Sequence, residues 1–197
     1  MSNSGQRPSK SPLAAKVAEQ THIMRDQISL YLDRARRAAR AQTIGSVCDV
    51  EPVLTAIART ITRINRDKDV QIEVAVTPGL KFRGETQDLE EMIGNLIDNA
   101  SKWSDRNVTV TAVPMIEGAE AGREWLMIMV DDDGPGLPAE KRADAVKRGK
   151  RLDETKPGSG LGLSIVTETA AMYGGSVVLG DADLGGLRVQ LKLPSVT

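Results

Sequence analysis

Several residue types and motifs are scarce or absent in this chain of 197 residues, and each absence excludes a class of protein or of binding site. A single cysteine, Cys48, excludes an internal disulfide framework, and we expect it to be a small buried hydrophobe rather than a reactive thiol. No apolar run reaches the roughly 18 residues of a membrane span, and there is no charged-then-apolar leader, so we expect no membrane contact. A P-loop is excluded because no G-K-[ST] motif occurs. The basic residues lack the aromatic and glycine interleaving that would indicate a nucleic-acid partner.

Charge is distributed unevenly along the chain. Residues 1–42 hold eight Lys/Arg against three Asp/Glu, whereas the remainder holds eighteen against twenty-four. Residues 1–10 are dominated by Ser, Gly, Pro and Asn, which is typical of a disordered leader or a cloning scar. Residues 11–45 open with a Ser-Pro cap and repeat small or apolar residues at steps of four and three, which predicts a long helix with a seam for a partner helix. Residues 46–197 are expected to form the main domain.

From residue 46 the hydrophobic pattern alternates between helical and strand periods, which predicts an α/β domain. The expected helices are 51–65, 86–104 and 161–173, and the expected strands are 70–76, 80–83, 108–113, 125–130, 176–179 and 187–193. The nearly continuous apolar run of 125–130 indicates a strand that is buried on both faces. Residues 137–157 are rich in charge and poor in large apolar side chains, so we expect a mobile loop there.

The helix expected at 86–104 carries an unusual row of polar residues. Glu91, Asn95, Asn99 and Lys102 follow one another at steps of four, four and three, so they share one helix face. Amides are intrinsically unfavourable in the middle of a helix, which suggests a function for them. An amide oxygen can coordinate Mg²⁺, and the lysine can supply a point charge for phosphates. A merely polar helix face is the alternative interpretation.

Two glycine-containing clusters follow. The first, Asp132-Asp133-Gly134-Pro135-Gly136, comes directly after an expected strand. A carboxylate at that point can accept a hydrogen bond from an exocyclic amine, although the same residues also suit an ordinary turn. The second, Gly158-Ser159-Gly160-Leu161-Gly162, opens a helix whose free N–H groups could receive phosphate. It does not follow the first strand of a βαβ unit, which argues against a Rossmann dinucleotide site.

In order and spacing, the three clusters resemble the N, G1 and G2 boxes of the catalytic, ATP-binding domain of sensor histidine kinases, over residues 46–194. The resemblance implies an α/β sandwich of the Bergerat type, with a mixed sheet packed on helices, and ATP and Mg²⁺ as cofactors. It also implies that Asn95 binds the metal, that Asn95, Asn99 and Lys102 contact phosphate, and that Trp103 lies beside the nucleotide. Asp132 would bind the adenine amino group, in a pocket shaped by Gly134 and Gly136. The hinge of the ATP lid would be formed by Gly158, Ser159, Gly160, Leu161 and Gly162.

Further expectations follow from the resemblance. Arg148 and Arg151 look most like the lid basics of PhoQ-type kinases, which reach the triphosphate. Glu91 lies where hydrolytic members of the wider superfamily place a glutamate that activates water. The implied reaction is transfer of the ATP γ-phosphoryl to a histidine and relay to the receiver domain of a response regulator, within a homodimeric parent sensor kinase. This chain would then be a cytoplasmic portion of a kinase anchored in the inner membrane.

The phosphoacceptor histidine of that family has no clear counterpart in this sequence. His22 is the sole histidine, and it has no adjacent acid and no proline five residues on, so we expect a structural or solvent-facing role for it. We interpret the chain as a fragment in which residues 11–45 are the second helix of the dimerisation hairpin. Two alternatives remain open: a non-catalytic nucleotide-binding module that docks a regulator or partner kinase, and a stand-alone ATPase that uses Glu91.

Overall fold

The computed structural model describes residues 45–115, 124–146 and 161–196. The chain divides into two units at residues 44 and 45, and the described residues belong to the second unit. The long helix expected at 11–45 therefore lies outside the described residues, apart from Gly45. So does His22.

Helices and strands alternate along the second unit as expected. The helices are α2 (Val50–Ile64), α3 (Thr86–Trp103), α4 (Ala139–Ala145) and α5 (Gly162–Met172), with a short 3-10 turn at Arg66–Lys68. The strands are β1 (Cys48–Asp49), β2 (Gln71–Val76), β3 (Lys81–Phe82), β4 (Asn107–Met115), β5 (Trp125–Asp132), β6 (Ser176–Asp181) and β7 (Leu187–Val196). Each helix and strand expected from residue 46 onward is confirmed within a few residues of its predicted ends.

The strands form one mixed sheet in the order β1-β3-β7-β5-β4-β2, and β6 also pairs with β7. The β2–β4 pair is parallel, while the other pairs are antiparallel. In the centre of the sheet, Val130 of β5 lies opposite Val110 of β4 and Val189 of β7. This arrangement confirms the predicted fold class, a mixed sheet packed on helices.

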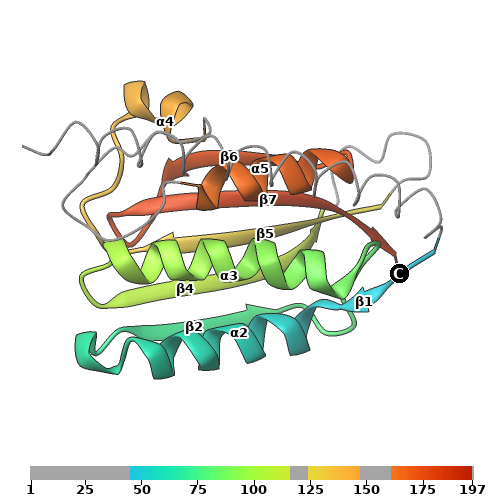
Figure 1. Ribbon diagram of the computed structural model, residues 1–197, viewed down its shortest axis with the longest axis horizontal. Helices are drawn as coiled ribbons and strands as arrows, with labels where there is room; N and C mark the ends of the chain where they lie inside the picture. The colour runs from blue at the N-terminus through green and yellow to red at the C-terminus, as the bar shows by residue number, and fades with distance from the viewer. Residues whose placement is uncertain (1–44, 116–123, 147–160, 197) are drawn as a thin grey trace, which may run out of the picture. The chain divides into compact units, whose positions relative to one another are not determined.

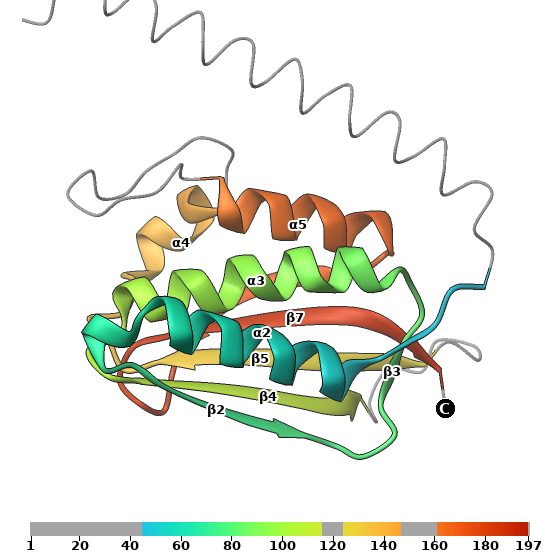
Figure 2. The ribbon, with the colours of Figure 1, turned by 60° about the horizontal axis from the view of Figure 1, so that its bottom comes forward.

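Helices α2, α3 and α5 lie along one face of the sheet, with α3 between the other two (Figures 1 and 2). The apolar positions of α3 recur every three or four residues, and they are buried between this helix and the strands. The central core therefore combines one stripe of α3 with alternate residues of the strands: Leu89, Met92, Ile93, Leu96 and Ile97 with Val110, Ala112, Ile128, Val130, Val189 and Leu191. The buried Cys48 belongs to the same core, as predicted.

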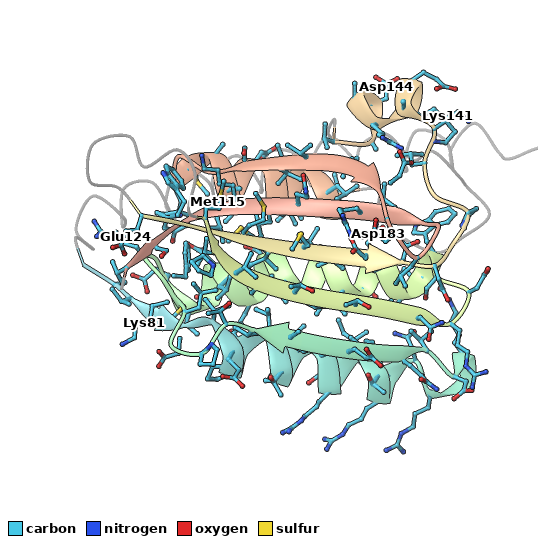
Figure 3. The ribbon with its side chains drawn as sticks, turned by 180° about the vertical axis from the view of Figure 1, so that it is seen from behind. Lys81, Met115, Glu124, Lys141, Asp144 and Asp183 are labelled. Atoms are coloured by element: carbon cyan, nitrogen blue, oxygen red, sulfur yellow. The ribbon has the colours of Figure 1, made fainter. Side chains whose placement is uncertain are left out.

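Two local expectations were wrong. Residues of β5 alternate between buried and half-buried positions, so the strand is not buried on both faces. Its second face has no covering helix among the described elements (Figure 3), and Met127 and Met129 are only half-buried there. In addition, the segment expected to be a loop at 137–157 contains the helix α4, which follows Pro138.

Candidate functional site

The polar row of α3 exists as predicted. Glu91, Asn95, Asn99 and Lys102 are all partly accessible, whereas Ile93, Leu96 and Ala100 are buried. Trp103, the last residue of the helix, is half-buried. An aromatic ring is therefore partly accessible at the carboxyl end of the polar row.

The side chain of Asn95 has a defined orientation. Its Nδ2 donates to the carbonyl of Glu91 at 2.7 Å, which leaves Oδ1 for another partner. A Cβ added at Gly162, the first residue of α5, would lie 3.2 Å from that Oδ1. The N-terminus of α5 therefore lies directly beside Asn95, and Gly162, the last residue of the glycine cluster at 158–162, meets the polar row of α3. A side chain larger than that of glycine at position 162 would crowd the amide.

Lys102 lies two helical turns beyond Asn95 on the same row. Its Nζ is 2.5 Å from Asp98 Oδ2, an i,i+4 pair on the helix surface. The side chain of Lys102 is about one-third exposed and that of Asp98 about half-exposed. An ion pair with this accessibility restrains the lysine side chain only weakly. The ammonium group of Lys102 therefore lies near the polar row of α3 without being buried in a fixed salt bridge.

Asp132, the last residue of β5, is a buried carboxylate with only 3% of its surface exposed. Its Oδ1 accepts hydrogen bonds from the N–H groups of Gly134 at 2.9 Å and Leu187 at 3.2 Å. No group among the described residues donates a hydrogen bond to Oδ2. Burial raises the pKa of Asp132, and the two N–H donors counteract that rise only in part.

Glycines surround this carboxylate because side chains would not fit. A Cβ at Gly134 would lie 2.2 Å from the carbonyl oxygen of Trp103, and one at Gly186 would lie 2.2 Å from Asp132 Oδ1. Gly136 has a φ of +69°, a conformation that side chains disfavour. The contact between Gly134 and Trp103 brings the glycine cluster at 132–136 against the carboxyl end of α3.

Asp133 has a different environment from its neighbour. Its carboxylate accepts hydrogen bonds from the N–H groups of Asp105, Arg106 and Asn107 at 2.9, 3.0 and 2.9 Å, and from Asn107 Nδ2 at 2.8 Å. Burial alone would raise its pKa, but these donors together lower it. Asp133 therefore fixes the connection from α3 to β4.

Sequence reasoning missed Gly186 and the N–H of Leu187, which complete the surroundings of Asp132 from the far end of the chain. The adjacent glycines 185 and 186 before β7 were the signal in the sequence that could have pointed to them.

Five candidate residues lie outside the described residues: Arg148, Arg151, Gly158, Ser159 and Gly160. Leu161 caps the start of α5 and is half-buried. In the described part of the chain, no three His, Cys, Asp or Glu residues gather as a metal cluster.

The candidate site thus combines an amide row along the carboxyl-terminal half of α3, a buried carboxylate at the end of β5 and glycines that pack closely against both. Residues 84–197 match the family described as histidine kinase-, DNA gyrase B-, and HSP90-like ATPase. The chain belongs to this family. Within the described ranges, no helix has the length and hydrophobicity to cross a bilayer.

Individual relatives narrow the comparison to sensor kinases. The sensor protein kinase CarS of Pseudomonas aeruginosa is 35% identical over 186 residues, covering 91% of this chain and 40% of CarS. The sensor protein PhoQ of Escherichia coli is 33% identical over 175 residues, covering 89% of this chain and 35% of PhoQ. The solved ATP binding domain of PrrB from Mycobacterium tuberculosis superposes with a TM-score of 0.63 at 26% identity, covering 79% of this chain and 100% of that structure. This chain therefore spans 35% to 40% of the length of these two curated relatives.

Proposed function

We propose that residues 46–197 bind ATP and act as the catalytic domain of a sensor histidine kinase. The observation that carries this proposal is the environment of Asp132, whose Oδ1 is fixed by two N–H donors while Oδ2 is left for a ligand. The exocyclic amine of adenine can donate a hydrogen bond to this oxygen. Gly134 and Gly186 would shape the base pocket by letting the backbone pack tightly around Asp132, where a Cβ would meet Trp103 O or Asp132 Oδ1.

The phosphates would lie along the polar row of α3. Asn99 and Lys102 would contact phosphate oxygens, with Trp103 beside the nucleotide. The oxygen chemistry at Asn95 fits Mg²⁺, because Oδ1 is the amide atom not engaged with the helix backbone. When bound, the ion would neutralise phosphate charge. Gly158, Ser159, Gly160, Leu161 and Gly162 would hinge the lid over the phosphates.

We propose further that the reaction is transfer of the γ-phosphoryl to a histidine, followed by relay to the receiver domain of a response regulator. Lys102, Arg148 and Arg151 would stabilise charge on the transferred group. The parent protein would be a homodimeric sensor kinase anchored in the inner membrane, with this domain in the cytoplasm. Support comes from the sensor-kinase relatives and from the meeting of the three motifs beside α3.

Isothermal calorimetry with ATP, with and without Mg²⁺, tests the proposed site. We expect Mg²⁺-dependent binding that weakens about tenfold or more in Asn95→Ala, because the variant loses the amide oxygen. Asn65→Ala is a matched control, since Asn65 Nδ2 makes the same kind of bond to the carbonyl four residues earlier, at the end of α2. Binding should be unchanged in this control. Absence of ATP binding by the wild type at millimolar concentration would refute the proposal.

The role of Glu91 separates the kinase from a hydrolytic ATPase. Glu91 lies on the same row, one turn before Asn95. If the domain is a kinase, phosphate release from ATP in the absence of a histidine acceptor should be slow, and Glu91→Gln should leave it nearly unchanged. Fast release that Glu91→Gln abolishes would instead indicate a water-activating glutamate. Assays of phosphate release with both proteins distinguish these outcomes.

A further inference from the structure

A groove lies between α2 and the edge strand β2, away from the residues assigned to the nucleotide. It has a volume of about 420 Å³. Its lining residues come from these two elements alone: Thr55, Ala58, Arg59, Thr62, Arg63, Ile72 and Val74. Ile72 and Val74 are half-buried, whereas Arg59 and Arg63 are exposed. The groove therefore has an apolar floor and a basic wall.

The backbone of β2 is available at this edge. β2 ends the strand order, and its one partner among the described strands is β4. Gln71 N–H donates to Arg106 O at 2.8 Å, and Thr77 N–H donates to Ala112 O at 2.9 Å. In a parallel pair, alternate residues bond to the same neighbour, so Ile72, Val74 and Val76 direct their N–H and C=O groups away from β4. These groups can pair with an added strand.

The spacing of the two arginines matches such a strand. Arg59 and Arg63 are four residues apart on α2, which is a rise of about 6 Å. Residues two apart in a strand are separated by about 6.6 Å and point to the same face. Two acidic side chains at alternate positions of an added strand could therefore reach one arginine each. The opposite face of β2 exposes Glu73, which disfavours acids at the intervening positions.

We propose that the groove binds an extended segment of a partner protein that carries two acidic residues two positions apart. The segment would extend the sheet at β2 and direct its acidic side chains toward α2. Figure 3 shows long side chains of α2 that extend beyond β2 at this edge, into the space beside the strand. The proposal concerns an edge of the sheet that contributes no residue to the nucleotide site, so it does not depend on ATP binding.

A designed peptide, Lys-Glu-Thr-Glu-Thr-Val-Lys with blocked ends, serves as the probe. It is titrated into the isotope-labelled 197-residue protein, and the amide resonances of Ile72, Val74 and Val76 are followed by NMR. We expect saturable shifts at these three amides and weaker binding at high salt. The double variant Arg59→Glu/Arg63→Glu should bind about tenfold more weakly or worse, since attraction becomes repulsion. Lys81→Glu/Arg83→Glu is a matched control with the same charge change in and directly after β3, and it should bind as the wild type does.

Two N-methylated peptides test strand pairing without altering the protein. One carries methyl groups on the odd-numbered backbone nitrogens and the other on the even-numbered ones. Because only alternate residues of an added strand donate to β2, one peptide should lose binding and the other should keep it. Equal binding by both would overturn the proposal. Absence of shifts at the β2 edge at millimolar peptide, or equal affinity in the Arg59→Glu/Arg63→Glu variant, would overturn it as well.

Discussion

Three consecutive carboxylates at the end of β5 have three different environments. Asp131 forms a two-pronged ion pair with Arg188, at 2.8 and 2.6 Å. Asp133 is held by several N–H donors, whereas Asp132 is buried without a cation partner among the described residues. Burial raises the pKa of Asp132, whereas its N–H donors lower the pKa of Asp133. The carboxylate that can still accept a ligand is thus the least stabilised of the three.

We expect Asp132→Asn to stabilise the ligand-free protein at pH 7. A raised pKa in the folded state means that the ionised carboxylate opposes folding, and this cost is present in full above the raised pKa. It disappears as the pH falls through that pKa toward the unfolded value near 3.9. The asparagine oxygen can still accept from Gly134 and Leu187. The melting temperature of the variant should exceed that of the wild type at pH 7, and the difference should shrink toward pH 4.

The same variant should lose ATP affinity. The Nδ2 group of asparagine would stand where Oδ2 accepts the adenine amine, so two donors would face each other. Loss of a hydrogen bond to a charged group costs about 1.5–3 kcal/mol, or about 10- to 100-fold in affinity. Asp69→Asn is the control, because its side chain is mostly exposed and pairs with Arg106 at the surface. Unchanged affinity in Asp132→Asn would show that the base does not bind there.

Residue types alone were enough to select much of the candidate site. Amides in the middle of a helix and a carboxylate after a strand contradict ordinary propensity, so Asn95 and Asp132 could be selected as candidates. Gly186 could not be selected in this way. A side chain is excluded at this position only by contact with Asp132, 54 residues earlier in the chain. The pairing of Asp131 with Arg188 is hidden for the same reason.

At the scale of elements, α3 and α5 are joined at two places. Gly162 meets Asn95 at one end of α5. At the other end, the Tyr173 hydroxyl donates to Asp88, and it accepts the N–H of Glu85 at 3.3 Å. The Tyr173 ring also packs edge-on against Phe82 at 4.9 Å. These contacts fix the position of α5 along α3, and therefore the position of its first residue beside Asn95.

Tyr173→Phe should destabilise the domain by about 1–2 kcal/mol. The variant keeps the ring contact with Phe82 but removes the hydroxyl from a buried carboxylate and from a backbone N–H. Urea unfolding at pH 7 measures the change. Thr60→Val is the control, since it removes an exposed hydroxyl that donates to a carbonyl of its own helix. A free energy of unfolding equal to that of the wild type in Tyr173→Phe would contradict this account.

The long periodic helices were predictable, whereas the short helix α4 was not. α2 and α3 each repeat apolar residues over several turns, so the sequence determines their type and approximate ends. α4 has seven residues and one buried side chain, Ala145, which gives no helical stripe to recognise. The run of 125–130 is apolar on both sides, but pairing with neighbouring strands half-covers Met127 and Met129 without a second helical layer.

At the scale of the whole domain, the candidate site depends on the folded state. Its parts come from α3, from the end of β5, from the turn before β7 and from the start of α5, which are distant in sequence. They come together only when the sheet and its helical layer have formed. A nucleotide bound across them would therefore bind the folded chain and not the unfolded one, and it should stabilise the domain by mass action.

Mg²⁺-ATP at one hundred times its dissociation constant should stabilise the domain by about 2.7 kcal/mol. For a chain of this size, that corresponds to a rise of roughly 5–10 °C in melting temperature. Thermal unfolding with increasing ATP measures the effect. Asp132→Asn should melt above the wild type without ATP but below it with saturating ATP, because the variant removes both the buried charge and the acceptor for adenine. If the two proteins keep the same order at every ATP concentration, the buried carboxylate does not link folding to nucleotide binding.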